Sequence, residues 1–125
     1  MPLPISLECA VNPRCCNEYR YGDLQPDTCG LRAVVVGGGP AGLYAAQTLA
    51  KRGVKVTLME RQKELGGTIN LAKKPPLKER MQWTIDYLAK GLERLGVDIR
   101  LNTEATADDI AALEPRSEER RVGKE

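Results

Sequence analysis

Residues 33–60, AVVVGGGPAGLYAAQTLAKRGVKVTLME, combine the patterns of a strand, a glycine turn, a helix and a second strand. The apolar run over residues 31–36 ends at a glycine, which is typical of a strand buried on both faces of a parallel sheet. A proline opens the helix that we expect over residues 40–52, where its missing N–H has no helical partner to lose. Apolar and polar residues alternate over residues 54–58 and predict a second strand, which ends at Glu60.

A second helix and a third strand follow a polar loop that contains glycines and prolines. Apolar residues recur every three or four positions over residues 77–95, which predicts an amphipathic helix. Val97, Ile99 and Leu101 alternate with polar residues and predict a third strand. This alternation of strands and helices indicates an α/β fold: a Rossmann-like, FAD/NAD(P)-binding, doubly wound parallel sheet, here incomplete.

Three glycines form the pattern G-x-G-x-x-G between the first strand and the first helix. Gly37 allows a tight turn, Gly39 lets a pyrophosphate approach the main chain, and Gly42 lets helix and strand pack closely. Pro40 and Ala41 begin the helix, whose free amides and positive dipole end attract phosphates. One alternative is a glycine-rich turn in an unrelated α/β protein. The pattern favours a dinucleotide site, because it lies within one strand–helix–strand unit.

The acid and the glycines after the second strand narrow the choice of dinucleotide. At the position of Glu60 a carboxylate accepts hydrogen bonds from ribose hydroxyls and repels a 2′-phosphate, although a solvated strand-end charge is the alternative. Gly66 and Gly67 form a second pair, which is typical of flavoproteins with two dinucleotide domains; an ordinary loop is the other interpretation. Arg61 could line the adenine or remain in solvent. Together these residues favour FAD over NAD.

Composition limits the partners. The chain has 125 residues, 42% of them hydrophobic, and a formal net charge of +2, which argues against nucleic acid or an anionic membrane as main partner. No apolar run is long enough to span a bilayer, and the first residues lack a signal-peptide pattern, so we expect a cytoplasmic protein. There is no histidine, which removes the usual general acid–base residue, and no catalytic residue is assigned.

Three segments carry a resemblance to a known family. They are CAVNPRCCNE at residues 9–18, GGGPAGLYAAQTLAKRGVKVTLMERQKELGGTINLAKKPP at residues 37–76, and WTIDYLAKGLERLGVDIRLNTEAT at residues 83–106. The two longer segments resemble the FAD-binding part of the NADH:flavin oxidoreductase family, which contains 2,4-dienoyl-CoA reductase, 2-enoate reductases and trimethylamine dehydrogenase. The first segment resembles the stretch that follows the iron–sulfur segment of those enzymes, where the last cluster cysteine stands before a short xxNP sequence.

The resemblance implies cofactors and site residues. Members carry an FMN barrel, a four-cysteine [4Fe-4S] site, and FAD and NAD(P)H domains. Electrons pass from NAD(P)H through FAD and the cluster to FMN, which reduces an activated C=C bond. Carried over to this sequence, the residues that would bind the ADP moiety of FAD are Gly37, Gly39, Gly42, Glu60, Gly66 and Gly67. Cys9 would be the fourth cluster ligand. In the trimethylamine dehydrogenase branch the equivalent pocket holds only ADP.

The chain also departs from the family. The barrel, the first three cluster cysteines and the NAD(P)H-binding glycine loop are absent, so we expect an internal fragment of an oxidoreductase that is inactive alone. We expect an irregular connector at residues 1–30 and a partial FAD-binding domain at 31–115. The charged tail, 116–125, resembles a translated sequencing adapter; a solvated terminus is the alternative. Two other functions stay open: the NAD-binding half of a dehydrogenase, and a truncated product that does not fold stably.

Overall fold

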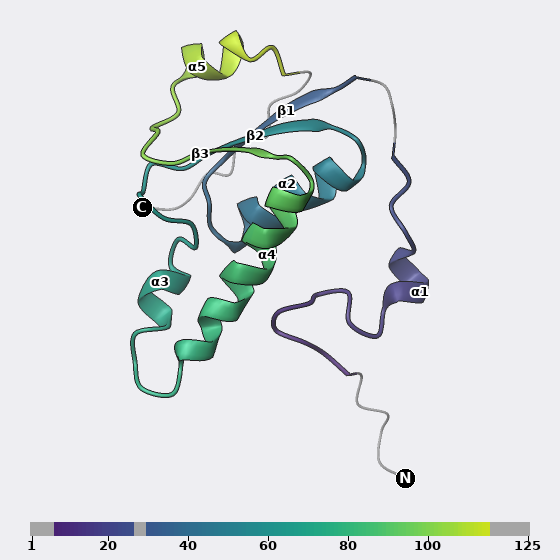
Figure 1. The fold of residues 1–125 in the computed structure, drawn as a ribbon, viewed down its shortest axis with the longest axis vertical. Coiled ribbons are helices and arrows are strands. Elements are labelled where there is room, and N and C mark those ends of the chain that lie inside the picture. Colours follow the sequence, from purple (N-terminus) through teal and green to yellow (C-terminus); the bar gives the residue numbers. More distant parts are fainter. Residues whose placement is uncertain (1–6, 27–29, 116–125) are drawn as a thin grey trace.

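Three parallel strands form one sheet within the described part of the chain, which comprises residues 7–26 and 30–115 of a computed structural model. The strands β1 (Arg32–Val36), β2 (Lys55–Met59) and β3 (Asp98–Arg100) lie in the order β1-β2-β3. Figure 1 shows them side by side. The predicted α/β fold with a parallel sheet is therefore confirmed. The charged tail, 116–125, lies outside the described residues.

The two long helices connect the strands. α2 (Pro40–Lys51) begins at the proline that the sequence analysis placed there. The second expected helix is α4 (Gln82–Arg94), preceded by the 3₁₀ turn η1 (Glu79–Met81). It starts later than predicted, because Leu77 has a φ of 67°, a left-handed conformation that an α-helix does not accept. Among residues 7–26 and 30–115, none of the helices has the length and hydrophobicity that crossing a bilayer requires.

Three short helices were not expected from the sequence: α1 (Glu18–Tyr21), α3 (Ile69–Ala72) and α5 (Ala107–Ala112). α5 begins with a capping box, in which Thr106 Oγ1 accepts from the Asp109 amide and the Asp109 carboxylate accepts from the Thr106 amide, both at 3.2 Å. Hydrogen bonds from the Thr106 side chain, and then from its main chain, lower the pKa of Asp109. Such local hydrogen bonds carry no hydrophobic period, so the pattern analysis did not detect this helix.

The hydrophobic core lies between the sheet and the pair formed by α2 and α4, as the crossing of these helices over one face indicates (Figure 1). Its buried members are Leu43, Ala46, Val56, Leu58, Leu88 and Leu92. The helices approach closely where Gly91 faces Gln47, since a Cβ at Gly91 would collide with the Gln47 amide. This packing fixes α2, and therefore the turn at its start, relative to the sheet.

α2 begins directly against the turn that follows β1. A Cβ at Gly42 would overlap the carbonyl oxygen of Gly37 and lie 3.5 Å from Val35 Cγ1. Gly37 itself has a φ of 103°, which other residues rarely adopt. The turn can therefore be this tight only with glycine at both places.

Truncating Leu92 to alanine should lower the free energy of unfolding by about 2–5 kcal/mol, because this side chain is fully buried. The same truncation at Leu77, which is 93% exposed, should change it by less than about 0.5 kcal/mol. Urea unfolding followed by circular dichroism measures both changes. Equal effects at the two leucines would contradict the assigned core.

The substitution Gly42→Ala should lower the thermal unfolding midpoint by at least about 5 °C, because the added methyl forces α2 away from the turn. Gly39→Ala is the matched control: no described atom lies within 4 Å of the added methyl, and its φ of −75° suits alanine. Its midpoint should stay at or above that of the unmodified protein. A Gly42→Ala protein as stable as the Gly39→Ala protein would refute the close approach.

Candidate functional site

The two glycine segments meet at the carboxyl end of the sheet. The Gly37 amide donates to the Met59 carbonyl at 2.8 Å, which ties the first turn to the end of β2. The Gly66 amide donates to the Gly38 carbonyl at 2.8 Å, which ties the second segment to the first. Main-chain hydrogen bonds therefore join the two glycine turns and the end of β2, which are far apart in the sequence.

Glu60 is fixed in this unit by its side chain and its main chain. Its Oε2 accepts from the Gly38 amide at 2.5 Å and its Oε1 from the Gln62 amide at 2.8 Å. The residue is only 7% exposed, yet it lines a cleft. A carboxylate offers about four lone-pair positions, so these two bonds leave acceptor capacity for a ligand.

The second glycine pair packs against the first glycine turn. Gly66 and Gly67 have φ values of 123° and 55°, in the range that favours glycine. A Cβ at Gly67 would lie 3.1 Å from the Gly39 Cα, and one at Gly66 would collide with Ile85 Cδ1. The pair is therefore a structural partner of the first turn and not an ordinary surface loop.

Several main-chain amides at this junction are free to bind an anion. Among the described residues, the amides of Gly39, Gly67 and Thr68 donate no hydrogen bond. Gly39 is also the N-cap of α2, and no described side chain caps that helix. Free amides beside the positive end of a helix dipole form a site for phosphate groups.

A cleft of about 960 Å³ opens beside these groups. Its walls come from the ends of β1 and β2, from the loop after β2 and from the segment after β3. Of the residues predicted to bind a cofactor, Gly37, Glu60, Arg61 and Gly67 line it. The other predicted residues belong to the two turns but do not line the cleft; they are Gly39, Pro40, Ala41, Gly42 and Gly66. The polar wall residues that were not predicted from the sequence are Gln62, Glu64, Thr68, Asn70, Lys74, Thr103 and Glu104.

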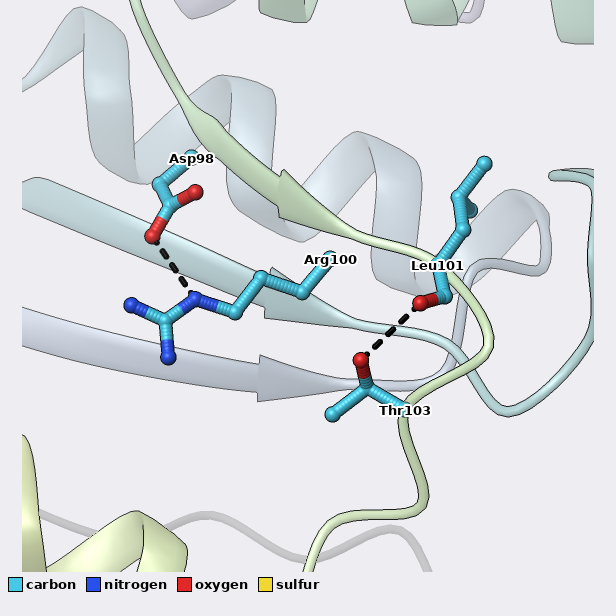
Figure 2. Close-up of polar contacts among 4 residues, drawn as sticks. All are labelled: Asp98, Arg100, Leu101 and Thr103. Carbon is cyan, nitrogen blue, oxygen red and sulfur yellow. Dashed lines mark hydrogen bonds and ion pairs between the residues drawn. The ribbon is translucent and has the colours of Figure 1, made fainter.

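The segment after β3 forms one wall because it is bonded to Glu60. The Thr103 amide donates to the Glu60 carbonyl at 2.9 Å, and Thr103 Oγ1 donates to the Leu101 carbonyl at 2.9 Å. Figure 2 shows this turn and, on β3, the ion pair between Arg100 and Asp98 at 3.0 Å. Since side chains alternate along a strand and Ile99 packs on the core, the ion pair lies on the face of the sheet opposite α2 and α4. No periodic pattern marks these contacts.

Cys9 lies in a separate part of the molecule. It is exposed, and its Sγ accepts a hydrogen bond from the Asn12 amide at 3.4 Å. The following connector packs at the other end of α2, where Arg14 and Leu24 line a smaller cavity with Lys51. Among residues 7–26 and 30–115, no three side chains of the metal-binding kind come together. One thiol cannot hold a four-iron cluster, so these residues do not form that site by themselves.

Known proteins resemble this chain in sequence and in fold. The family of NAD(P)-binding Rossmann-like domains matches residues 35–101. An NADH oxidase of Thermoanaerobacter brockii is 42% identical over 89% of the chain and 17% of its own length. A cinnamate reductase of Clostridium sporogenes is 38% identical over 84% and 16%. The structure of a 2-naphthoyl-CoA reductase superposes with a TM-score of 0.77, at 40% identity, over 86% of the chain and 16% of that protein.

These likenesses agree with the fold described above. The chain spans about one sixth of the length of the relatives that it matches. The resemblance expected from the sequence is confirmed, because the relatives are an NADH oxidase and reductases such as those of cinnamate, bilirubin and 2-naphthoyl-CoA. The chain belongs to the family of NAD(P)-binding Rossmann-like domains.

Proposed function

We propose that the cleft binds the ADP moiety of FAD as part of a flavin-dependent oxidoreductase. One observation carries this proposal: the buried carboxylate of Glu60 is held at 2.5 Å from the Gly38 amide, beside amides that have no partner. An acceptor for ribose hydroxyls thus stands next to donors for a diphosphate, which is the arrangement that an adenine dinucleotide needs.

The proposed pose follows from these groups. The diphosphate lies at the edge of the cleft, against Gly67, which lines it, and the adjacent Gly39, whose amides have no partner among the described residues. The adenosine ribose bonds to Glu60. Arg61, which lines the cleft next to Glu60, lies along the adenine. Pro40, Ala41 and Gly42 place the first turn of α2 against the diphosphate, and Gly66 supports the second turn.

The second glycine pair favours FAD over NAD as the ligand. The Gly66 amide donates to the Gly38 carbonyl, which holds the neighbouring Gly67 at the wall of the cleft. Such a pair is typical of flavoproteins with two dinucleotide domains, and the relatives are an NADH oxidase and reductases. A nicotinamide dinucleotide in the same cleft is the competing ligand, and binding measurements separate the two.

The wider activity that we propose belongs to a protein of the relatives' length. In such a protein FAD would supply hydride acceptance from NAD(P)H, and a [4Fe-4S] cluster and FMN would supply the electron transfer that reduction of a C=C bond requires. The described residues of this chain bind and orient the adenine end of FAD. We propose no catalytic residue within it, and we expect the chain to be inactive by itself. Its partners would be the barrel and the NAD(P)H domain.

Cys9 is proposed as the fourth ligand of that cluster. The Asn12 amide donates to its sulfur, and hydrogen bonds from the amides of Asn12 and then Val11 lower the pKa of Cys9. A lowered pKa favours the thiolate, which is the form that binds metal. Three further ligands would have to come from residues outside the described part of the chain.

Titration calorimetry of the 125-residue chain should detect binding of ADP and of FAD. ADP that carries a 2′-phosphate should bind at least about tenfold more weakly, because the added charge meets the Glu60 carboxylate. Glu60→Gln should weaken ADP binding about tenfold and remove this discrimination. The control Glu93→Gln, an exposed change on α4, should alter neither.

Two results of that titration would count against the proposal. A folded chain that gives no heat with ADP or with FAD would show that the cleft is not an adenine-dinucleotide site. Binding of NADH without binding of FAD would favour the dehydrogenase alternative.

Iodoacetamide should modify Cys9 faster than Cys15 at pH 8, because the thiolate is the nucleophile. Hydrogen bonds lower the pKa of Cys9, whereas the hydrogen bond with Cys16 raises the pKa of Cys15. Peptide mass spectrometry follows both sites. Asn12→Pro, which removes the amide N–H, should slow the reaction of Cys9. Equal rates at the two cysteines would refute the proposed thiolate stabilisation.

A further inference from the structure

The Asn70 side chain lies beneath the second glycine turn. Its Nδ2 donates to the Leu65 carbonyl at 3.0 Å, and its own amide donates to the Gly67 carbonyl at 3.1 Å. A Cβ at Gly66 would lie 2.9 Å from both Nδ2 and Oδ1 of this side chain. The Asn70 amide group therefore fills the space that the absent side chain of Gly66 leaves open.

Hydrogen bonds continue from this side chain to the proposed ribose acceptor. Asn70 donates to the carbonyl of Leu65. The next residue is Gly66, and its amide donates to the Gly38 carbonyl at 2.8 Å. The Gly38 amide in turn donates to Glu60 at 2.5 Å. Asn70 thus stands at one end of a series of bonds that reaches Glu60 at the other.

The acceptor atom of Asn70 contributes nothing to this series. Its Oδ1 is buried and accepts no hydrogen bond from any described residue. A buried acceptor without a donor destabilises the folded state, and an apolar side chain of similar shape would avoid that loss. What distinguishes asparagine from an apolar side chain at this position is therefore its donor bond to the Leu65 carbonyl, which orients the glycine turn.

We propose that Asn70 is a positioning residue for diphosphate binding. By holding the Leu65 carbonyl, it keeps the Gly67 amide opposite Gly39, so that both turns present their free amides to one ligand. This inference rests on the proposed function of the cleft, and it assigns to that site a residue that acts through Leu65. It also predicts that Asn70 affects only binding of the diphosphate, whereas Glu60 affects binding of the ribose.

The test compares ADP with adenosine on the 125-residue chain and its Asn70→Leu variant. Leucine has nearly the same shape as asparagine but cannot donate a hydrogen bond. The variant should bind ADP about tenfold more weakly, in line with the loss of one positioned hydrogen bond. Its weak binding of adenosine, which lacks phosphate and is followed by ligand-observed NMR, should stay within about twofold. Its unfolding midpoint should change little, because removal of the unpaired Oδ1 offsets loss of the donor to the Leu65 carbonyl.

Asn17→Leu is the matched control, since the Asn17 Nδ2 also donates to a main-chain carbonyl, that of Cys15, at 3.2 Å and outside the cleft. ADP affinity should be unchanged in this variant. If Asn70→Leu fails to fold, Asn70→Ala serves in its place with the same expected affinities.

The possible outcomes separate this inference from the function on which it rests. Weaker ADP binding with unchanged adenosine binding and an unchanged or higher midpoint would support the positioning role. Loss of both affinities together with a lower midpoint would overturn it, because that result indicates a general structural role. Unchanged ADP affinity would overturn it while leaving the proposed function intact. An unmodified chain that binds neither ADP nor FAD would refute the proposed function and, with it, the role of Asn70.

Discussion

Gly38 uses both of its main-chain polar groups to join the parts of the site. Its amide donates to Glu60 Oε2 at 2.5 Å, and its carbonyl accepts from Gly66 at 2.8 Å. A Cβ at this position would lie 2.7 Å from Leu65 Cδ2 and 2.9 Å from Glu60 Oε2. Only glycine leaves room for both neighbours. The mutual placement of the first turn, the carboxylate and the second turn depends on this one residue.

The same constraint explains how a carboxylate can be buried at the edge of the cleft. Removing an ionised group from water is unfavourable unless hydrogen bonds compensate, and Glu60 receives them from two amides. Its position is therefore set before any ligand arrives. A site whose acceptor and donors are already oriented loses little ordering entropy on binding, which favours affinity for a matching ligand.

The connector and the cleft lie at opposite ends of α2. The first turn precedes this 12-residue helix, whereas the connector packs where the helix ends at Lys51, about 18 Å away along the axis. The dinucleotide cleft can thus be completed by residues 31–115 without the cysteine segment. Under the proposed function, the two regions would serve different cofactors of a longer protein, which agrees with the small share of the relatives' length that this chain spans.

Local sequence determined most of the fold. The strand at 31–36, the proline start of α2 and the strand that ends before Glu60 each follow from residue types a few positions apart, so a pattern search finds them. The glycine pattern also predicted where the cleft lies. The φ of 103° at Gly37 and the close contact at Gly42 exclude nearly every other residue, so the tight turn is visible in the sequence. The late start of α4 and the capping box of α5 depend on single torsions and local hydrogen bonds, which periodicity does not reveal.

The contacts that assemble the site arise from folding and are not visible in the sequence. The sequence treats Gly38 as a variable position between two glycines, and nothing in the spacing indicates that it bonds to both Glu60 and Gly66. Asn70 and Thr103 likewise have no distinguishing pattern, since each acts through a carbonyl or amide that folding brings within 3.0 Å. A repeating pattern of apolar residues indicates which face of one helix or strand is buried. A site depends on contacts between different elements, which such a pattern does not contain.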